Sequence, residues 1–410
     1  MFGQKFNSCI KIIICFLSTV YAENSPTLVK QTYRFNSLPD DGSYLLNLNN
    51  ISGDLIVTGH EGSGAFINIE KITFGVTKED IPNIHKKEKI IVTHLEDQYQ
   101  INILGDSTNK KSNFIQTLIK LNLPKHIHLN FNILGGDISI NDIIGNLDLS
   151  TLGGDISIID SNGEINSKTN GGTVTIQGSM GNSKVHSFGG KINLKNFKGS
   201  VSGSTIGGDI LLESISGNIN CQSSGGFISL TEIDANTISC RASGGEIIGN
   251  NLDGNLTLKC FGDKIQIKNI NGISNLYSSG GDILVENHSG TLLINSEKGN
   301  IIIEEAVGGI EAITSSGDID ADLSYDSSVN DYSVYMETHL GNIKTIIPKN
   351  YPANMENIVY QTTSIKSIDS EIILNIDVEH EKVIGKRSIA GGIIPFSLKA
   401  HHGTITIKDK

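Results

Sequence analysis

Hydrophobic and polar residues alternate with a period of two along most of this chain, and glycines interrupt the alternation at regular intervals. Runs such as 137–140 (Asp-Ile-Ser-Ile) and 146–149 (Asn-Leu-Asp-Leu) place every second side chain on the same face. Such alternation indicates β-strands with one buried face, because successive side chains of a strand point to opposite sides. The pattern predicts an all-β protein made of many short strands.

A longer period of 18 residues organises residues 131–321. The second glycine of a Gly-Gly corner recurs with this spacing, after one extra residue before Gly245 and with an aspartate at position 263. These corner positions are Gly136, Gly154, Gly172, Gly190, Gly208, Gly226, Gly245, Asp263, Gly281, Gly299 and Gly317. An aliphatic residue follows each corner by two positions, at Ile138, Ile156, Val174, Ile192, Ile210, Ile228, Ile247, Ile265, Ile283, Ile301 and Ile319. A fixed period near 20 residues indicates a solenoid, in which each repeat packs on its neighbours.

Each repeat divides into two halves, because another glycine follows most corners by nine residues. These glycines are Gly145, Gly163, Gly181, Gly199, Gly217, Gly254, Gly272, Gly290 and Gly308. We expect the glycines to supply the positive φ of tight corners. The unit then forms a coil of two strands, and the sequence predicts a single-stranded parallel β-helix (a β-solenoid) with 18-residue coils. No proline lies between Pro124 and Pro348, as expected where backbone N–H groups must join ladders.

The flanking segments lack the 18-residue period, and we divide the chain into four parts. Residues 1–22 resemble a secretory signal peptide, with Lys5 and Lys11 before the apolar run 12–20 and a cleavage site after Ala22. Residues 23–130 form a β-rich N-terminal cap, 131–321 the β-helix, and 322–410 a C-terminal strand continuation and cap. Caps are expected because the end of a solenoid is an unpaired strand edge.

Several strands and one loop are predicted in the caps. The expected strands cover 44–48, 54–57, 66–69, 89–93, 99–103, 117–123, 371–377, 396–400 and 404–408. Residues 322–330 should form a loop, because the next corner-like unit, Gly341-Asn342-Ile343, follows Gly317 by 24 residues.

Composition and charge exclude one class of partner. The chain has 44 acidic against 32 basic side chains, a formal charge of −12 that becomes −14 when the signal peptide is removed, and only three arginines. Such a chain has no electrostatic footprint for nucleic acid. After signal cleavage no transmembrane segment is expected, because the apolar run 12–20 is shorter than the ~20 residues of a spanning helix.

A column of small residues stands three positions before each corner. Its members are Thr151, Thr169, Ser187, Thr205, Ser223, Ala242, Cys260, Ser278, Ser296 and Thr314. We interpret it as an internal ladder at a tight bend, with hydroxyls bonding to nearby backbone. Cys221 and Cys240 share another column, five residues before successive corners. Their stacking would permit a disulfide, but we favour two buried free thiols.

Aspartates recur just after the corners, at Asp137, Asp155, Asp209, Asp282 and Asp318. A calcium ladder would need an acidic residue in every turn. The same column also holds Thr173, Lys191, Phe227 and Lys264. We therefore favour solvated turn residues over a calcium or acid–base ladder.

Histidine pairs occur in both caps, as His126 with His128 and His401 with His402. They lack a cysteine or carboxylate spacing typical of zinc sites, so a zinc site is disfavoured. Polysaccharide-cleaving β-helices need grouped carboxylates and a basic residue. Here the repeats offer Arg241 and a few aromatics such as Phe227 and Tyr277. The sequence therefore predicts no catalytic, cofactor-binding or metal-ligating residue.

The chain resembles a bacterial family of secreted β-strand-repeat proteins named "putative adhesins", related to the head GIN domain. The resemblance covers about residues 40–410 and rests on the Gly-Gly-Asp-Ile-like corners, the segment 119–124 (Ile-Lys-Leu-Asn-Leu-Pro), and the ending segments 341–348, 391–398 and 403–407. It implies a right-handed parallel β-helix without an established catalytic set.

The function expected from these features is that of an exported, non-enzymatic β-solenoid. It would act in adhesion or at the cell envelope, by binding a surface polysaccharide or an envelope or host protein through its strand faces. The alternative is a polysaccharide lyase or glycoside hydrolase of the parallel β-helix type. We expect a periplasmic, cell-surface or extracellular location. The oligomeric state is not predicted.

Overall fold

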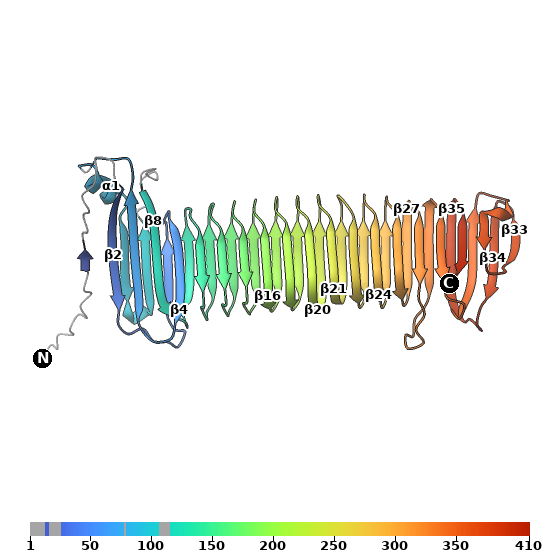
Figure 1. The fold of residues 1–410 in the computed structure, drawn as a ribbon, viewed down its shortest axis with the longest axis horizontal. Helices are drawn as coiled ribbons and strands as arrows, with labels where there is room; N and C mark the ends of the chain where they lie inside the picture. The colour runs from blue at the N-terminus through green and yellow to red at the C-terminus, as the bar shows by residue number, and fades with distance from the viewer. Residues whose placement is uncertain (1–12, 16–25, 78, 106–114) are drawn as a thin grey trace. The chain divides into compact units, whose positions relative to one another are not determined.

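The structure is a computed structural model of the chain and describes residues 13–15, 26–77, 79–105 and 115–410. It is an all-β protein that divides into two compact units, unit 1 (1–199) and unit 2 (200–410), which we describe separately (Figure 1). The expected signal peptide lies outside the described residues, except for the short strand β1. Among the described residues, no helix has the length and apolar character needed to cross a bilayer.

Unit 1 contains sixteen strands and two short helical segments among its described residues. The strands are β1 (Ile13–Cys15), β2 (Thr27–Phe35), β3 (Leu45–Asn49), β4 (Asp54–His60), β5 (Ala65–Thr73), β6 (Ile90–Leu95), β7 (Gln100–Gly105), β8 (Ile115–Pro124), β9 (His128–Ile133), β10 (Ile138–Asn141), β11 (Leu147–Thr151), β12 (Ile156–Ile159), β13 (Ile165–Thr169), β14 (Val174–Gln177), β15 (Ser183–Ser187) and β16 (Ile192–Lys198). The helical segments are α1 (Ile81–Lys87) and the 3₁₀ turn η1 (Glu96–Gln98).

The chain of unit 1 alternates between two columns of parallel strands. One column contains β4, β10, β12, β14 and β16, and the other contains β3, β9, β11, β13 and β15. Ile138 pairs with Ile156 and Leu147 with Ile165, so partners along the repeats are 18 residues apart. This register keeps the aliphatic side chains of successive corners stacked on one another inside the unit.

Antiparallel strands cover the beginning of unit 1. The strands β7 and β8 continue the two columns in parallel with β3 and β4. They are then paired with antiparallel neighbours, β6 on β7 and β5 on β8, and β2 joins β5. The six strands expected here are present, whereas β2 and α1 were not predicted. Parallel pairing already includes β3 and β4, although the boundary at residue 130 stays a prediction.

Unit 2 contains twenty strands and one 3₁₀ turn. The strands are β17 (Val201–Thr205), β18 (Ile210–Ser216), β19 (Ile219–Ser223), β20 (Ile228–Ala242), β21 (Ile247–Cys260), β22 (Ile265–Asn271), β23 (Ser274–Ser278), β24 (Ile283–Ser289), β25 (Leu292–Ser296), β26 (Ile301–Val307), β27 (Ile310–Ser316), β28 (Ile319–Leu323), β29 (Val334–Leu340), β30 (Ile343–Ile347), β31 (Ala353–Tyr360), β32 (Ile368–Ser370), β33 (Asn375–Glu379), β34 (Lys382–Ser388), β35 (Ile394–His402) and β36 (Ile405–Asp409). The turn is η2 (Ile365–Ser367).

Two columns of parallel strands also build unit 2, and the long strands β20 and β21 contribute to both. The columns extend through β29 and β30 to β35 and β36, so residues 394–409 stack on strands about 62 positions earlier. At the C-terminal end, β34 pairs antiparallel with β31 and β33. The expected strand 371–377 was misplaced, since β33 covers 375–379, and the loop after β28 covers 324–333 rather than 322–330.

The core of both units consists of the aliphatic ladder that follows the corners. All eleven of its members, from Ile138 to Ile319, are at most 1% exposed. Burial of such side chains contributes roughly 2 kcal/mol each.

The expectation of positive φ holds for only some of the corner glycines. Gly163 and Gly181 have φ of 141° and 127°, whereas Gly154 does not adopt left-handed backbone. At Gly154 the reason for glycine is space, because a Cβ would lie 1.9 Å from the carbonyl oxygen of Gly136.

Candidate functional site

The small-residue column forms a buried ladder of hydrogen bonds at the corners. The Thr169 hydroxyl donates to the carbonyl of Gly154 (2.8 Å) and accepts from the N–H of Gly172 (3.1 Å). Ser223 makes the equivalent bonds in unit 2, and the Cys260 thiol donates to the carbonyl of Gly245 at 3.2 Å. These groups satisfy backbone atoms inside the fold, as predicted, and are not available for chemistry.

The aspartate column is a second ladder, on the outside of the corners. Oδ1 of Asp137 accepts the backbone N–H of Asp155 at 2.8 Å, and Oδ1 of Asp155 accepts that of Thr173 at 2.7 Å. Asp282 and Asp318 accept from Asn300 and Asn342 in the same way, each at 2.7 Å. The sequence interpretation of solvated turn residues missed this bond. The signal for it was the Asp or Asn that recurs beside each corner.

Cys221 and Cys240 are partners in the register of β19 and β20, and both are buried free thiols, as is Cys260. A hydrogen bond between Cys221 and Cys240, together with burial, raises the pKa of the Cys240 thiol. A thiol with a raised pKa holds little thiolate and is a poor nucleophile.

Arg241 belongs to an aromatic cluster on the surface of unit 2. Its guanidinium lies 4.0 Å from the ring centroid of Phe261, and the rings of Phe261 and Tyr277 are 5.5 Å apart. The Tyr277 hydroxyl donates to Glu297, and this bond raises the pKa of Tyr277. We call Arg241, Phe261, Tyr277 and Glu297 the stacking cluster. It combines flat apolar faces with charged edges across neighbouring repeats, which the sequence pattern alone did not group.

A smaller apolar stripe lies on the corners of unit 1. Leu134, Leu152 and Phe188 occupy the same repeat position and are about half exposed, at 45%, 54% and 54%. Phe227, named with Tyr277 as a possible sugar-contacting aromatic, is half-buried and its N–H donates to Asp209 instead.

A glutamate and two histidines come together on strands β29 and β35. Nε2 of His401 lies 2.7 Å from Oε1 of Glu337, and the rings of His401 and His339 are stacked with centroids 4.6 Å apart. On its other face His401 stacks against Tyr360, also at 4.6 Å. One ligand atom from each of Glu337, His339 and His401 lies within 4.8 Å of the others. We call these three residues the Glu-His cluster.

Hydrogen bonds set the electrostatics of Glu337. Partial burial raises its pKa, but hydrogen bonds from Tyr335 and His401 and the charges of His401 and His339 outweigh burial, so the pKa of Glu337 is lowered overall. The Tyr335 hydroxyl donates to Oε2 of Glu337 and accepts from Lys399 at 3.4 Å. Glu337 is therefore a carboxylate at neutral pH, with one oxygen directed to the histidines.

The histidine pairs proposed from the sequence do not form the sites considered there. His126 bonds to Asp40 at 2.9 Å, His128 accepts the N–H of Asn146 at 2.9 Å, and His402 is exposed beside the cluster but not part of it. Sequence reasoning missed Glu337 and His339. Their spacing of two residues on an expected strand was the available signal.

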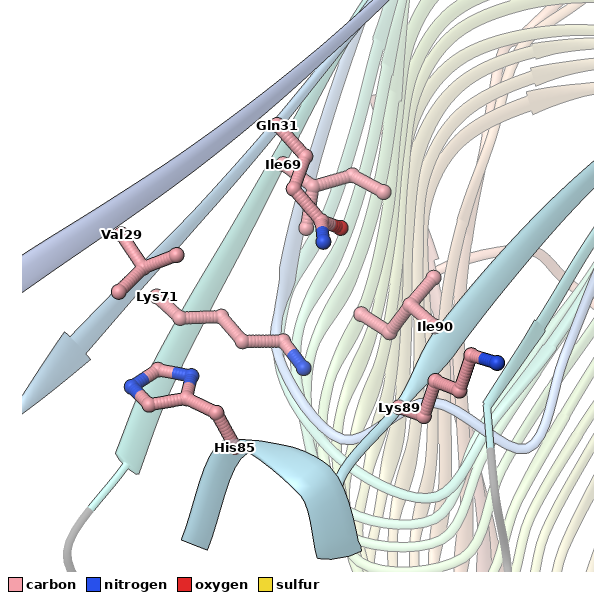
Figure 2. Close-up of a pocket in the computed structure, with 7 residues that line it drawn as sticks. All are labelled: Val29, Gln31, Ile69, Lys71, His85, Lys89 and Ile90. Atoms are coloured by element: carbon pink, nitrogen blue, oxygen red, sulfur yellow. The ribbon is translucent and has the colours of Figure 1, made fainter. Parts of the chain in front are cut away.

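A small cavity lies in unit 1 between β2, β5 and α1 (Figure 2). Its volume is about 70 Å³, and the side chain of Lys71 runs across it, with its ammonium donating to the carbonyl of Glu88. Burial lowers the pKa of Lys71, and burial and the Lys71 charge lower the pKa of His85. Small-molecule sites start at roughly 300 Å³, so this cavity has room only for a few water molecules.

Comparison with known proteins gives likenesses of structure only. No family model matches the chain, and no curated protein matches it. Similar solved structures include a putative adhesin from Bacteroides fragilis, with 16% identity, 78% of this chain and 97% of that chain covered and a TM-score of 0.23. Another putative adhesin, from Parabacteroides distasonis, has 13% identity, the same coverages and a TM-score of 0.25. A putative cell adhesion protein from Clostridium sporogenes has 11% identity, 95% and 100% coverage and a TM-score of 0.16. At these TM-scores the likenesses carry no functional argument, and the resemblance to the head GIN family stays a prediction.

Proposed function

We propose that this chain is an exported, non-enzymatic, right-handed β-solenoid with 18-residue coils that binds an extended surface polysaccharide through its outer strand faces. It would act as an adhesin or at the cell envelope. The observation that supports the proposal is the stacking cluster on unit 2.

The stacking cluster has the side-chain chemistry of a sugar contact. Aromatic rings supply large, rigid contact area, and Tyr277 adds a polar hydroxyl at its edge. Arg241 and Glu297 place one cation and one carboxylate beside the rings, where they can bond to sugar hydroxyls. Parallel strands repeat about every 4.8 Å, so the cluster lies on a surface suited to a polymer with many repeating groups.

The test is binding of untagged protein (23–410) to a glycan and envelope-polymer array, with product release assayed on each ligand. The variants are Phe261→Ser and Tyr277→Asn, because Ser279 and Asn295 occupy the equivalent positions of the next repeat. These changes remove the rings but keep residues that the fold already accepts. The matched control is Asn295→Ala, an exposed position beside Tyr277.

We expect a polysaccharide to bind without turnover and each variant to lose at least about tenfold in affinity, as for central contact residues. The control should bind as the wild type does. Binding only to proteins, or equal affinity in all variants, would refute the assignment of the stacking cluster. Release of cleaved product would instead establish the polysaccharide-cleaving alternative.

A further inference from the structure

We propose that Glu337, His339 and His401 bind a divalent transition-metal ion, with Zn²⁺ as the best-fitting ion. This site is separate from the stacking cluster and does not depend on the polysaccharide proposal. Three arguments carry it: the register of the strands, the ligand chemistry and the groups that orient the ligands.

The register of β29 and β35 places the three side chains on one face. Thr338 pairs with Ala400 and Leu340 with His402, so His339 lies opposite His401 on the neighbouring strand. Glu337 lies two residues before His339, and alternate residues of a strand share a face. Two ligands from one strand and a third from its neighbour thus converge without any loop, on backbone fixed by ladder hydrogen bonds.

The ligand set suits zinc. Two imidazoles and one carboxylate are a recognised protein set for Zn²⁺ and leave the fourth position of a tetrahedron open. Tetrahedral ligand atoms at zinc distances are roughly 3.3 Å apart. In the structure the Glu337 and His401 atoms are 2.7 Å apart, and all three ligand atoms lie within 4.8 Å. Shifts of about 1 Å would complete the geometry, and His339 is exposed and free to make them.

Neighbouring groups hold the ligands in place. The Tyr335 hydroxyl binds Oε2 of Glu337 and leaves Oε1 facing the histidines, while Tyr360 packs flat on the ring of His401. Partners of this kind fix ligand orientation in metal sites. Lys399 is the nearest cation, and its ammonium lies over the Tyr335 ring at 4.9 Å.

An ion pair between His401 and Glu337 is the alternative to a metal site. It would explain their 2.7 Å contact without giving His339 a role. A bound metal ion would replace the proton between them and engage His339 as well. The two interpretations therefore differ in what happens when His339 is removed.

The experiment titrates untagged, chelator-treated protein with ZnCl₂ in competition with a fluorescent chelator, and with CoCl₂ by visible absorption. We expect one equivalent of Zn²⁺ and the intense absorption of four-coordinate Co²⁺. His339→Ala and Glu337→Gln should weaken Zn²⁺ binding by more than about 100-fold, because loss of even an orienting partner costs 10–100-fold. His402→Ala is the matched control and should bind as the wild type does.

His339 is exposed, so His339→Ala should keep the wild-type circular dichroism spectrum and unfolding temperature. If the wild type binds no Zn²⁺ at micromolar concentrations, the contact is an ion pair only and the proposal is wrong. It is also wrong if His339→Ala binds as tightly as the wild type, or if His402→Ala loses affinity to the same extent.

Discussion

His288 places a titratable side chain where neighbouring repeats have aliphatic ones. It lies on β24 between Ile270 and Ala306 in the register and is 1% exposed. Its Nε2 lies 3.0 Å from the Ser274 hydroxyl, and its Nδ1 has no partner among the described residues. Burial lowers the pKa of His288 to about 4, so the imidazole is neutral in the folded protein at neutral pH.

This burial predicts a pH-dependent loss of stability. Between pH 6.5 and about 4 the unfolded chain binds a proton at His288 that the folded chain does not. The free energy of unfolding should therefore fall as the pH is lowered through this window, by roughly 3 kcal/mol in total. Above pH 6.5 the contribution is fully present.

Urea unfolding at several pH values between 7 and 4 measures this effect. His288→Ile, which introduces the residue that Ile270 supplies at the same position of the preceding repeat, removes the titration and should flatten the pH dependence by about one proton. Carboxylates also titrate at the acid end of the range, so the comparison with the variant decides. The same slope in both proteins would show that His288 is not the cause.

Among the secondary-structure elements, the corner between β11 and β12 depends on close backbone contact. A Cβ on Gly154 would lie 1.9 Å from the carbonyl oxygen of Gly136, whereas a Cβ on Gly153 would meet nothing within 4 Å. Adjacent glycines with the same spacing thus have different reasons to be glycine.

We predict that Gly154→Ala lowers the free energy of unfolding by roughly 2–4 kcal/mol, because backbone atoms must separate. Gly153→Ala should change it by no more than about 0.5 kcal/mol. Chemical denaturation of both variants provides the measurement. Equal losses at the two positions would mean that the stacking contact does not explain the regular glycine spacing within this chain.

The elements that repeat could be predicted from the sequence, and those that depend on a single long-range pairing could not. Alternation and the corner spacing indicate the strands around Ile138 and Leu147, because each repeat packs on a neighbour of the same pattern. The contact of β29 with β35 joins residues 62 positions apart, outside any period. For that reason the sequence offered His401 with His402, whereas the structure groups it with Glu337 and His339.

The antiparallel strands were predicted only as strands, for a related reason. Alternation in 66–69 and 117–123 indicates a buried face, but it does not contain the direction of the partner strand. In the structure β5 lies antiparallel on β8, and β2 on β5. The aspartate ladder was partly visible, since the sequence shows the recurrence of aspartate beside the corners but not its bond to the next repeat.

For the molecule as a whole, stability should be local to the repeats. Each strand in a column touches only the strands before and after it, so the stability of such a protein is close to a sum over neighbours. A defect in one repeat should then weaken its neighbours and leave distant repeats unchanged.

Hydrogen exchange followed by mass spectrometry can test this locality. In Gly154→Ala we expect protection to fall by about 10–100-fold in β10, β12 and β14. The strands β24 and β26 of unit 2 should keep wild-type protection, and Gly153→Ala should leave both regions unchanged. A uniform loss of protection along the chain would show one cooperative transition instead.

The aspartate ladder also bears on how a chain of this kind can lengthen. Each aspartate accepts the N–H of the residue 18 positions later, as Asp137 does for Asp155 and Asp155 for Thr173. An in-frame duplication of 18 residues therefore adds one donor together with one acceptor and leaves neither unmatched. Gene-level copying of a repeat is structurally neutral at this bond, so the number of repeats can drift while the corner chemistry stays constant.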